Sequence, residues 1–421
     1  VLPRNPGWLN SLVDIIRKMV TSRPTAAGRA AYTKISAFLL STWPDICTSL
    51  LFEDIVVDKS GSKPFSYLFI NLVLIDLRSS FPTLLSQLNS ANFYEISQRL
   101  GAAFDVISVF IGFLIQSLDA PNKCKLCLAP DLLLKIRKDV AETMSLTIEY
   151  LRDRWDASVA GAAGLHPSAR TGIPEARPEI TWDSAKDRVY RDPLIFAGIR
   201  SLAIWIREDE NENLRCESAG LMDMLIDLYN IDESEKDSFD FRYSIALALE
   251  GILTTQDGVD AFLRQGGWQI FEKDLNKIIR ITADCREIDK AFLSAEVSRG
   301  LQIVRVLLAV LDHPSTGIIE EVWMSIVKAT VGIKVESNQI IPIVTEFHIS
   351  MLQISMVLLE KNSGGMTKRY ITALAPLSGL VTQLEYQLNK MTNMSEAAEL
   401  RELLLDASSE LMNLRSYRDS E

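Results

Sequence analysis

The chain has 421 residues and carries 44 Lys and Arg against 55 Asp and Glu, a formal net charge of −11. Apolar residues make up 48% and charged residues 24%, which are globular averages and exclude a disordered tail or a fibrous protein. The negative charge disfavours a general nucleic-acid binder, because phosphate backbones are bound by clustered Lys and Arg. Residues 1–35 are the exception, since they hold six basic residues and one acidic residue.

Apolar residues recur at three- and four-residue steps along most of the chain, which is the spacing of one helix face. The first part of the chain is predicted to form helices over Trp8 to Val20, Thr25 to Thr42, Pro64 to Leu77, Asn92 to Leu118 and Asp131 to Trp155. The second part is predicted to form helices over Pro193 to Ile206, Leu214 to Tyr229, Phe239 to Leu253, Trp268 to Ile279, Ile288 to Leu311, Thr316 to Val331, Ile341 to Glu360, Met366 to Asn389 and Ser395 to Leu414. Pairs of these helices follow one another at about 40 to 50 residues, the range of armadillo and HEAT units. We therefore expect an all-α, armadillo/HEAT-like α-solenoid of stacked helix pairs.

Turn signals separate the expected helices. Asp192 followed by Pro193 predicts a helix start, because Asp accepts hydrogen bonds from first-turn amides and Pro fits the first helical position. The polar run Glu208 to Asn213 predicts a short turn, so the helices on either side of it form a hairpin. Gly266 and Gly267 mark another turn.

The stretch Asp156 to Arg191 departs from the helical pattern. It contains several Gly and Pro residues and is longer than the roughly 12 to 15 residues usual for a structureless connection. An ordered loop packed on the surface and a floppy linker remain alternatives. We expect N-terminal helical repeats over 1–156, a long irregular loop over 157–191 and C-terminal repeats over 192–421, in one continuous solenoid.

The longest apolar stretches, Tyr67 to Ile75 and Val106 to Ile115, are shorter than the roughly 18 to 20 residues that cross a bilayer, so we expect buried helices and no membrane span. Five cysteines are too few for a secreted disulfide scaffold. A reducing compartment fits this content best, so we expect the cytoplasm or the nucleus.

Enzymatic motifs are missing from the sequence. It has no phosphate-binding GxxxxGK[ST] loop, no GxGxxG, no GxSxG elbow and no HExxH. Cys124 and Cys127 form a CxxC pair, but a four-ligand zinc site needs two more donors, and an interhelical loop that carries two thiols is the simpler interpretation. An enzyme that uses this pair or His166 is the remaining alternative. We predict no catalytic activity, no metal and no cofactor.

The negative charge is concentrated between Ile206 and Asp240, where twelve acidic and three basic residues give a net charge of −9. Such runs are usually solvated faces; the alternative is that this one attracts a basic peptide or tail. Arg side chains near a helix end suit its dipole and are also favoured at interfaces. The candidate protein-binding residues are Arg152, Arg154, His166, Arg170, Glu208, Asp209, Glu210 and Glu212.

Two successive segments carry a family resemblance. Asp192-Pro-Leu-Ile-Phe-Ala-Gly-Ile-Arg-Ser-Leu-Ala-Ile-Trp-Ile-Arg-Glu-Asp-Glu210 and Leu214-Arg-Cys-Glu-Ser-Ala-Gly-Leu-Met222 resemble the neurochondrin signature, in which an apolar helix with an arginine runs into W-L-x-E-E/D and a second helix begins with Leu-Arg/Lys-x-Glu. Ile206 stands where the family more often has Leu. Pro64 to Ser80 and Thr147 to Ser168 are similar to the fungal branch of the family.

This resemblance implies an armadillo-like, soluble, non-enzymatic protein, and animal members are cytosolic adaptors that bind receptor tails and signalling proteins. Together with the missing catalytic motifs, it leads us to expect a helical-repeat scaffold or adaptor that binds partner proteins on an extended surface. The alternative is a chaperone or nucleotide-exchange factor for a GTPase or another assembling client. The oligomeric state is left open.

Overall fold

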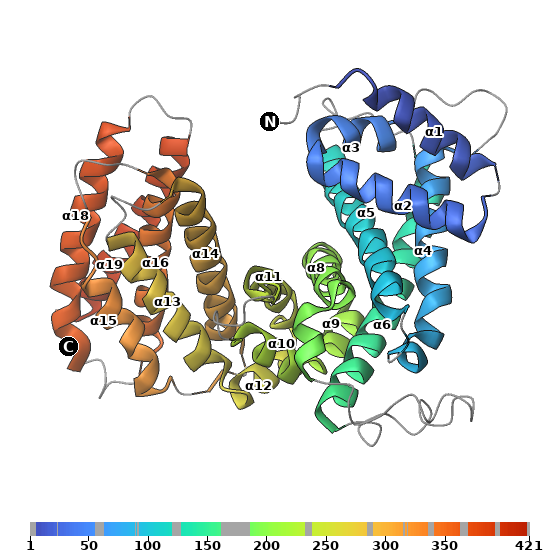
Figure 1. Ribbon diagram of the computed structural model, residues 1–421. Helices are drawn as coiled ribbons and strands as arrows, with labels where there is room; N and C mark the ends of the chain where they lie inside the picture. Colours follow the sequence, from blue (N-terminus) through green and yellow to red (C-terminus); the bar gives the residue numbers. More distant parts are fainter. Residues whose placement is uncertain are drawn as a thin grey trace. The chain divides into compact units, whose positions relative to one another are not determined.

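The computed structural model describes residues 6–22, 24–54, 63–88, 90, 92–119, 128–160, 186–231, 238–283, 289–314, 316–317, 319–335, 341–362, 369–391 and 396–418. The chain forms two compact units, unit 1 (Val1–Ala248) and unit 2 (Leu249–Glu421). All regular elements among the described residues are helices (Figure 1). The prediction of an all-α fold is confirmed.

Unit 1 contains helices of very different lengths. Its elements are α1 (Leu9–Thr21), α2 (Ala26–Thr42), α3 (Pro44–Phe52), α4 (Phe65–Leu84), η1 (Leu85–Gln87), α5 (Phe93–Asp119), α6 (Pro130–Ala160), η4 (Lys186–Arg191), α8 (Pro193–Glu208), α9 (Glu212–Ala219) and α10 (Met222–Tyr229). Helix α11 (Arg242–Ile252) begins in unit 1 and ends in unit 2.

Unit 2 is also built from paired helices. Its elements are α12 (Gln256–Arg264), α13 (Gly267–Ala283), α14 (Lys290–Asp312), η5 (Glu321–Met324), α15 (Ser325–Val331), α16 (Pro342–Glu360), η6 (Ile371–Ala373), α18 (Leu374–Lys390) and α19 (Glu396–Arg418).

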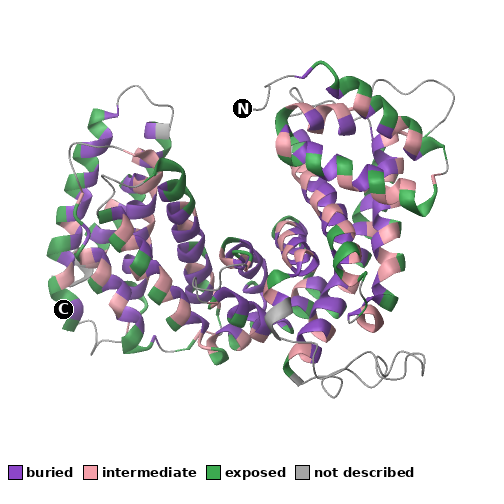
Figure 2. Ribbon diagram, viewed as in Figure 1, coloured by how far each residue is buried: buried purple, intermediate pink, exposed green. Residues whose placement is uncertain are grey.

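The helices of each unit stack in two layers. In unit 1, α2, α5 and α8 form one layer and α4, α6 and α9 the other, with α4 packed on α5 and α6 packed on α8. In unit 2, α14, α16 and α19 form one layer and α13, α15 and α18 the other. Buried residues concentrate where the layers meet (Figure 2). Each unit is thus built from stacked helix pairs of the armadillo/HEAT-like kind; one solenoid continuous through both units, with divisions at 156 and 192, stays a prediction.

The α5–α8 pair forms the most extensive helix contact in unit 1. A methyl group added to Gly101 would lie 3.2 Å from the carbonyl oxygen of Pro193, so the two backbones approach closely where α8 begins. Further along, the buried hydroxyls of Ser108 and Ser201 share a hydrogen bond of 2.6 Å. Small residues at these positions allow the two helices to pack at close range.

Several expected boundaries were wrong. The predicted helix Leu214 to Tyr229 is two helices, α9 and α10, because the chain turns at Gly220, whose amide bonds the carbonyl of Glu217. The helix from Pro64 continues through Pro82 to Leu84. Helix α12 was not predicted, since it is only nine residues long and short helices give a weak periodic signal.

The prediction of an irregular loop over 157–191 falls mostly on residues 161–185, which lie outside the described residues. At the two ends of this range, helix α6 continues to Ala160 and η4 begins at Lys186. The choice between an ordered loop and a linker therefore stays open.

The turn predicted at Gly266 and Gly267 is confirmed between α12 and α13. Gly266 has φ 70°, a conformation that glycine adopts without strain.

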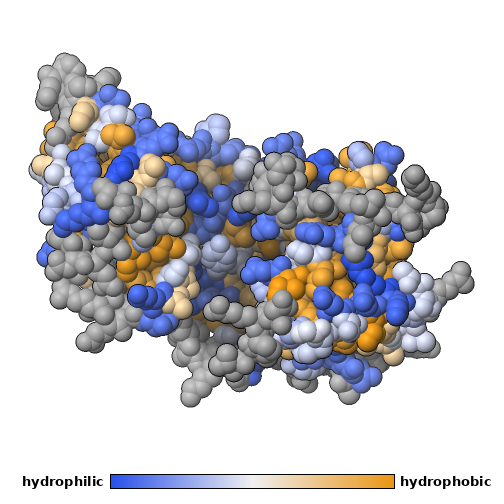
Figure 3. Space-filling view, turned by 90° about the horizontal axis from the view of Figure 1, so that it is seen from above, coloured by the Kyte–Doolittle hydropathy of each residue, from blue (hydrophilic) through white to orange (hydrophobic). Residues whose placement is uncertain are grey.

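Three helices are long and apolar enough to cross a membrane by length and composition alone: Phe65–Gln87, Phe93–Leu118 and Pro342–Glu360. They are longer than the uninterrupted apolar runs of the sequence because each helix continues beyond its run. In the second and third, 61% of the apolar window is buried inside the protein, as expected for core helices. Seen from above, hydrophobic residues on the surface are interleaved with hydrophilic ones (Figure 3). A chain without membrane spans stays a prediction.

The packing of α14 makes Gly300 a sensitive position. A methyl group there would lie 2.8 Å from the ring of Phe347 on α16 and 3.1 Å from Ile278 on α13. We expect Gly300→Ala to lower the free energy of unfolding by about 1–3 kcal/mol, because the buried ring must move. Gly379→Ala is the control, since nothing lies within 4 Å of that position in α18 and Ala should raise helix stability by about 0.5–1 kcal/mol. Equal urea midpoints for both variants would contradict this packing.

His348 on α16 gives unit 2 a pH dependence. Burial lowers the pKa of this side chain from 6.5 to about 4. As the pH falls below 6.5, His348 is protonated in the unfolded chain but stays neutral in the folded protein until about pH 4. The free energy of unfolding is therefore highest above pH 6.5 and decreases between pH 6.5 and about pH 4. We expect a loss of about 2 kcal/mol between pH 7 and pH 5, measured by urea unfolding. A His348→Gln variant with the same loss would refute this assignment.

Candidate protein-binding surface

The acidic turn, defined here as Glu208–Glu212, lies between two helices whose starts are fixed by side-chain caps. The carboxylate of Asp192 accepts a hydrogen bond of 3.0 Å from the Leu194 amide at the start of α8. The side chain of Asn211 accepts one of 3.3 Å from the Leu214 amide at the start of α9. This part of the sequence folds locally as predicted, and the caps hold the carboxylates of the turn near the α9 N-terminus, where negative charge is favoured.

One carboxylate of the acidic turn faces the protein rather than solvent. Asp209 has a side chain that is 5% exposed and pairs with Arg137 of α6, with Oδ1 2.6 Å from Nη2 and 3.2 Å from Nε. This ion pair joins α6 to the end of α8. Asp209 therefore has a structural partner, whereas it was predicted to contact a binding protein.

Arg152, another predicted contact residue, is also engaged within unit 1. Its Nη1 donates to the carbonyl oxygen of Gly220 at 2.5 Å and lies 2.8 Å from Oδ1 of Asp223 on α10. Its Nε lies 3.2 Å from the Asp156 carboxylate on its own helix. With 41% of the side chain exposed, Arg152 stays within reach of a partner, but it already holds α6 to the α9–α10 turn.

The placement of Arg154 corrects the prediction that it contacts a partner. This side chain is only 2% exposed, so no protein can reach it directly. It lies near Asp192, where burial raises the pKa of the carboxyl while the Ser97 hydrogen bond and the Arg154 charge partly offset this effect. The sequence held a signal, since the buried residues Thr147 and Tyr150 precede Arg154 at helical spacing.

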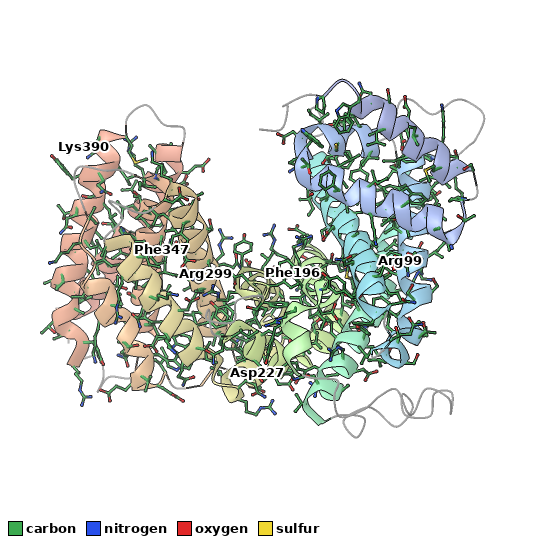
Figure 4. The ribbon with its side chains drawn as sticks, in the orientation of Figure 1. Arg99, Phe196, Asp227, Arg299, Phe347 and Lys390 are labelled. Atoms are coloured by element: carbon green, nitrogen blue, oxygen red, sulfur yellow. The ribbon has the colours of Figure 1, made fainter. Side chains whose placement is uncertain are left out.

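The other carboxylates of the acidic turn are exposed. Among the described residues, Glu208 pairs with its neighbour Arg207, at 2.8 Å. Glu210, Glu212 and Asp227 (Figure 4) are exposed, and no ion pair with another described residue involves them. Two of the eight predicted contact residues, Glu210 and Glu212, are thus both exposed and unengaged in the described part of unit 1.

Two predicted contact residues, His166 and Arg170, lie outside the described residues, as do Cys124 and Cys127 and the acidic residues within 232–237. Their predicted roles stay predictions. In the described ranges, no three His, Cys, Asp or Glu side chains come close enough to hold a metal ion. The thiol of Cys47 is buried, which raises its pKa to about 11 and keeps it protonated at neutral pH.

An aromatic cluster formed by α8 and the segment just before α11 was not predicted from the sequence. Phe196 (Figure 4) stacks on Phe239 with ring centroids 4.9 Å apart and meets Phe241 edge-on at 5.4 Å. The guanidinium of Arg200 lies over the Phe196 ring at 5.8 Å. Phe239 is 37% exposed, so part of this cluster is accessible, and Tyr243, two residues after Phe241, is 48% exposed. The alternating aromatics of Phe239-Asp-Phe-Arg-Tyr243 were the available signal.

The stacked helix pairs of each unit are the defining feature of a helical-repeat protein. The neurochondrin family model matches residues 1–331, and the chain belongs to this family, which confirms the resemblance. The uncharacterized protein C16C4.02c of Schizosaccharomyces pombe is 20% identical over 214 residues, which are 51% of this chain and 33% of the relative. The match therefore spans about a third of the length of that curated relative.

Two solved structures share a distant likeness. One is SYS-1, at 12% identity and a TM-score of 0.36, covering 97% of this chain and 79% of SYS-1. The other is the SYS-1/POP-1 complex, at 9% identity and a TM-score of 0.36, covering 96% of this chain and 85% of the matched chain.

The Arg137–Asp209 pair should stabilise unit 1 more than an ordinary surface pair. Because Asp209 is buried and Arg137 is 59% exposed, we expect a coupling free energy of about 0.5–1 kcal/mol in a double-mutant cycle with Arg137→Met and Asp209→Asn. The control is Lys138–Glu142 on the same helix, exposed on both sides and 3.8 Å apart, with an expected coupling below about 0.5 kcal/mol. Urea unfolding measures both; equal couplings would mean that Asp209 is not anchored by Arg137.

Proposed function

We propose that the chain is a non-enzymatic helical-repeat scaffold or adaptor, and that the acidic turn binds a basic peptide or tail of a partner protein. The supporting observation is that the carboxylates of the acidic turn differ in their contacts. Asp209 is tied to Arg137 inside unit 1, while Glu210 and Glu212 are exposed and unengaged among the described residues. The internal pair fixes the position of the turn, and the outer carboxylates are left to meet a partner.

Electrostatics favours a basic partner at this turn. The segment from Ile206 to Asp240 has a net charge of −9, most of the −11 of the whole chain, so the negative potential is local. Such a field raises the association rate of a cationic ligand and weakens with salt. Membership of the neurochondrin family, whose resemblance implies adaptors that bind tails, agrees with this role.

We place this activity in the cytoplasm or the nucleus. The support is the small number of cysteines and the free state of Cys47 and Cys216, which suits a reducing compartment. No described feature favours the alternative, a chaperone or nucleotide-exchange factor, over binding alone. Stimulated nucleotide release from a GTPase would distinguish the alternative.

The proposal is tested with a fluorescent 15-residue peptide rich in Lys and Arg. We expect the paired substitution Glu210→Gln and Glu212→Gln to weaken binding about three- to tenfold at low salt, because two exposed charges each contribute up to about 1 kcal/mol. The matched control is Glu399→Gln with Glu402→Gln on α19, two exposed acidic residues of unit 2.

Fluorescence anisotropy measures both variants over a range of salt concentrations. The same affinity for the two double variants would show that general acidity, and not the acidic turn, attracts the peptide. Binding that does not weaken with salt would equally contradict the proposal.

A further inference from the structure

Helix α2 lies next to α5 in the α2–α5–α8 layer and also packs against α1 and α3. Its buried face includes Tyr32, Ser36 and Leu40, and the Tyr32 ring lies 5.9 Å from that of Phe69 on α4. The opposite face of α2 carries exposed residues. The exposed face of a surface helix is normally polar.

The outer face of α2 is apolar instead. Ala27, Ala31, Ile35 and Phe38 are exposed and follow one another at steps of three and four residues, which places them in one stripe about 16 Å long. Ile35 is 39% and Phe38 61% exposed. We call this stripe the α2 ridge; Figure 2 shows exposed residues along α2.

A tryptophan extends the exposed apolar surface at the C-terminal end of α2. Trp8 is 50% exposed, and its ring meets that of Trp43 edge-on with centroids 5.5 Å apart. Trp43 is the residue that follows α2, five positions after Phe38. Trp and Phe are residue types enriched at protein interfaces.

The sequence around the ridge has more basic than acidic residues. Residues 14–45 contain five basic residues and two acidic ones, Asp14 and Asp45, in a chain whose net charge is −11. Lys34 lies on α2 beside the ridge at helical spacing, and Lys18 is exposed on α1. Neither lysine pairs with a carboxylate in the described part of the chain, whereas Arg17 lies 3.9 Å from Asp54.

We infer that the α2 ridge binds an acidic amphipathic helix of a partner protein. The apolar stripe has the length of about three helical turns and would receive leucine-like residues at i, i+3, i+4 and i+7, while a glutamate flanking them would meet Lys34. A membrane surface is the weaker match, because interfacial helices carry a denser basic face than two free lysines. This surface is separate in sequence from the acidic turn and takes a ligand of opposite charge, so the two proposals stand or fall independently.

The test uses the full chain and a designed 18-residue helical peptide with leucines on one face and glutamates on the other. Fluorescence anisotropy should show binding that weakens about tenfold in Phe38→Ala and in Lys34→Glu. The matched control is Tyr94→Ala on α5, since Tyr94 is 63% exposed and should leave the affinity unchanged. Both substituted side chains are at the surface, and circular dichroism melting confirms that the variants fold.

Four results would overturn the inference. One is no binding of the glutamate peptide to the wild-type chain, and another is equal binding by Phe38→Ala and Tyr94→Ala. A third is equal affinity for the same peptide with lysine in place of glutamate. The fourth is that another ligand occupies the ridge. In that case the peptide fails to bind, while cosedimentation with phosphatidylserine vesicles, or self-association measured by analytical ultracentrifugation, is observed and is abolished by Phe38→Ala.

Discussion

The close packing of α5 on α8 is the constraint on which the rest of unit 1 depends. Gly101 lets the α8 backbone approach, and the Ser108–Ser201 hydrogen bond of 2.6 Å closes the contact further along. A hydroxyl pair buried between helices is favourable only when both groups are satisfied, so it fixes the register as well as the distance. With α8 held in this way, its end at Glu208 and the acidic turn that follows have a defined position beside α6.

Two arginines of α6 form ion pairs with some carboxylates of the acidic segment and leave others exposed. Arg137 and Arg152 each bond a carboxylate about 70 residues away in sequence, Asp209 and Asp223 respectively. These pairs stabilise the hairpin, whereas Glu210 and Glu212 stay exposed to solvent. The same sequence run therefore serves both the fold and the proposed contact with a partner. On α2 the signs are reversed, with an apolar ridge on a helix that has no acidic residue.

Much of the architecture could be predicted from the sequence because helix periodicity and caps are local. The start of α8 at Asp192–Pro193 and the turn at Gly266 depend only on neighbouring residues. The site was less predictable, because ion pairs such as Arg137–Asp209 depend on which helices pack together. Arg154 is a second example: it is buried with Thr147 and Tyr150 on a face of α6 beside the apolar stripe, and burial of that face depends on which helices pack against it.

The central claim is that a rigid α5–α8 core presents the acidic turn to a basic partner. Hydrogen–deuterium exchange of the whole chain, with and without a Lys- and Arg-rich peptide, tests it most directly. The account predicts that the amides of α5 and α8 exchange most slowly in unit 1, and that the peptide slows exchange chiefly at residues 208–214. Fast exchange along α8, or protection by the peptide elsewhere and not at this turn, would contradict the account.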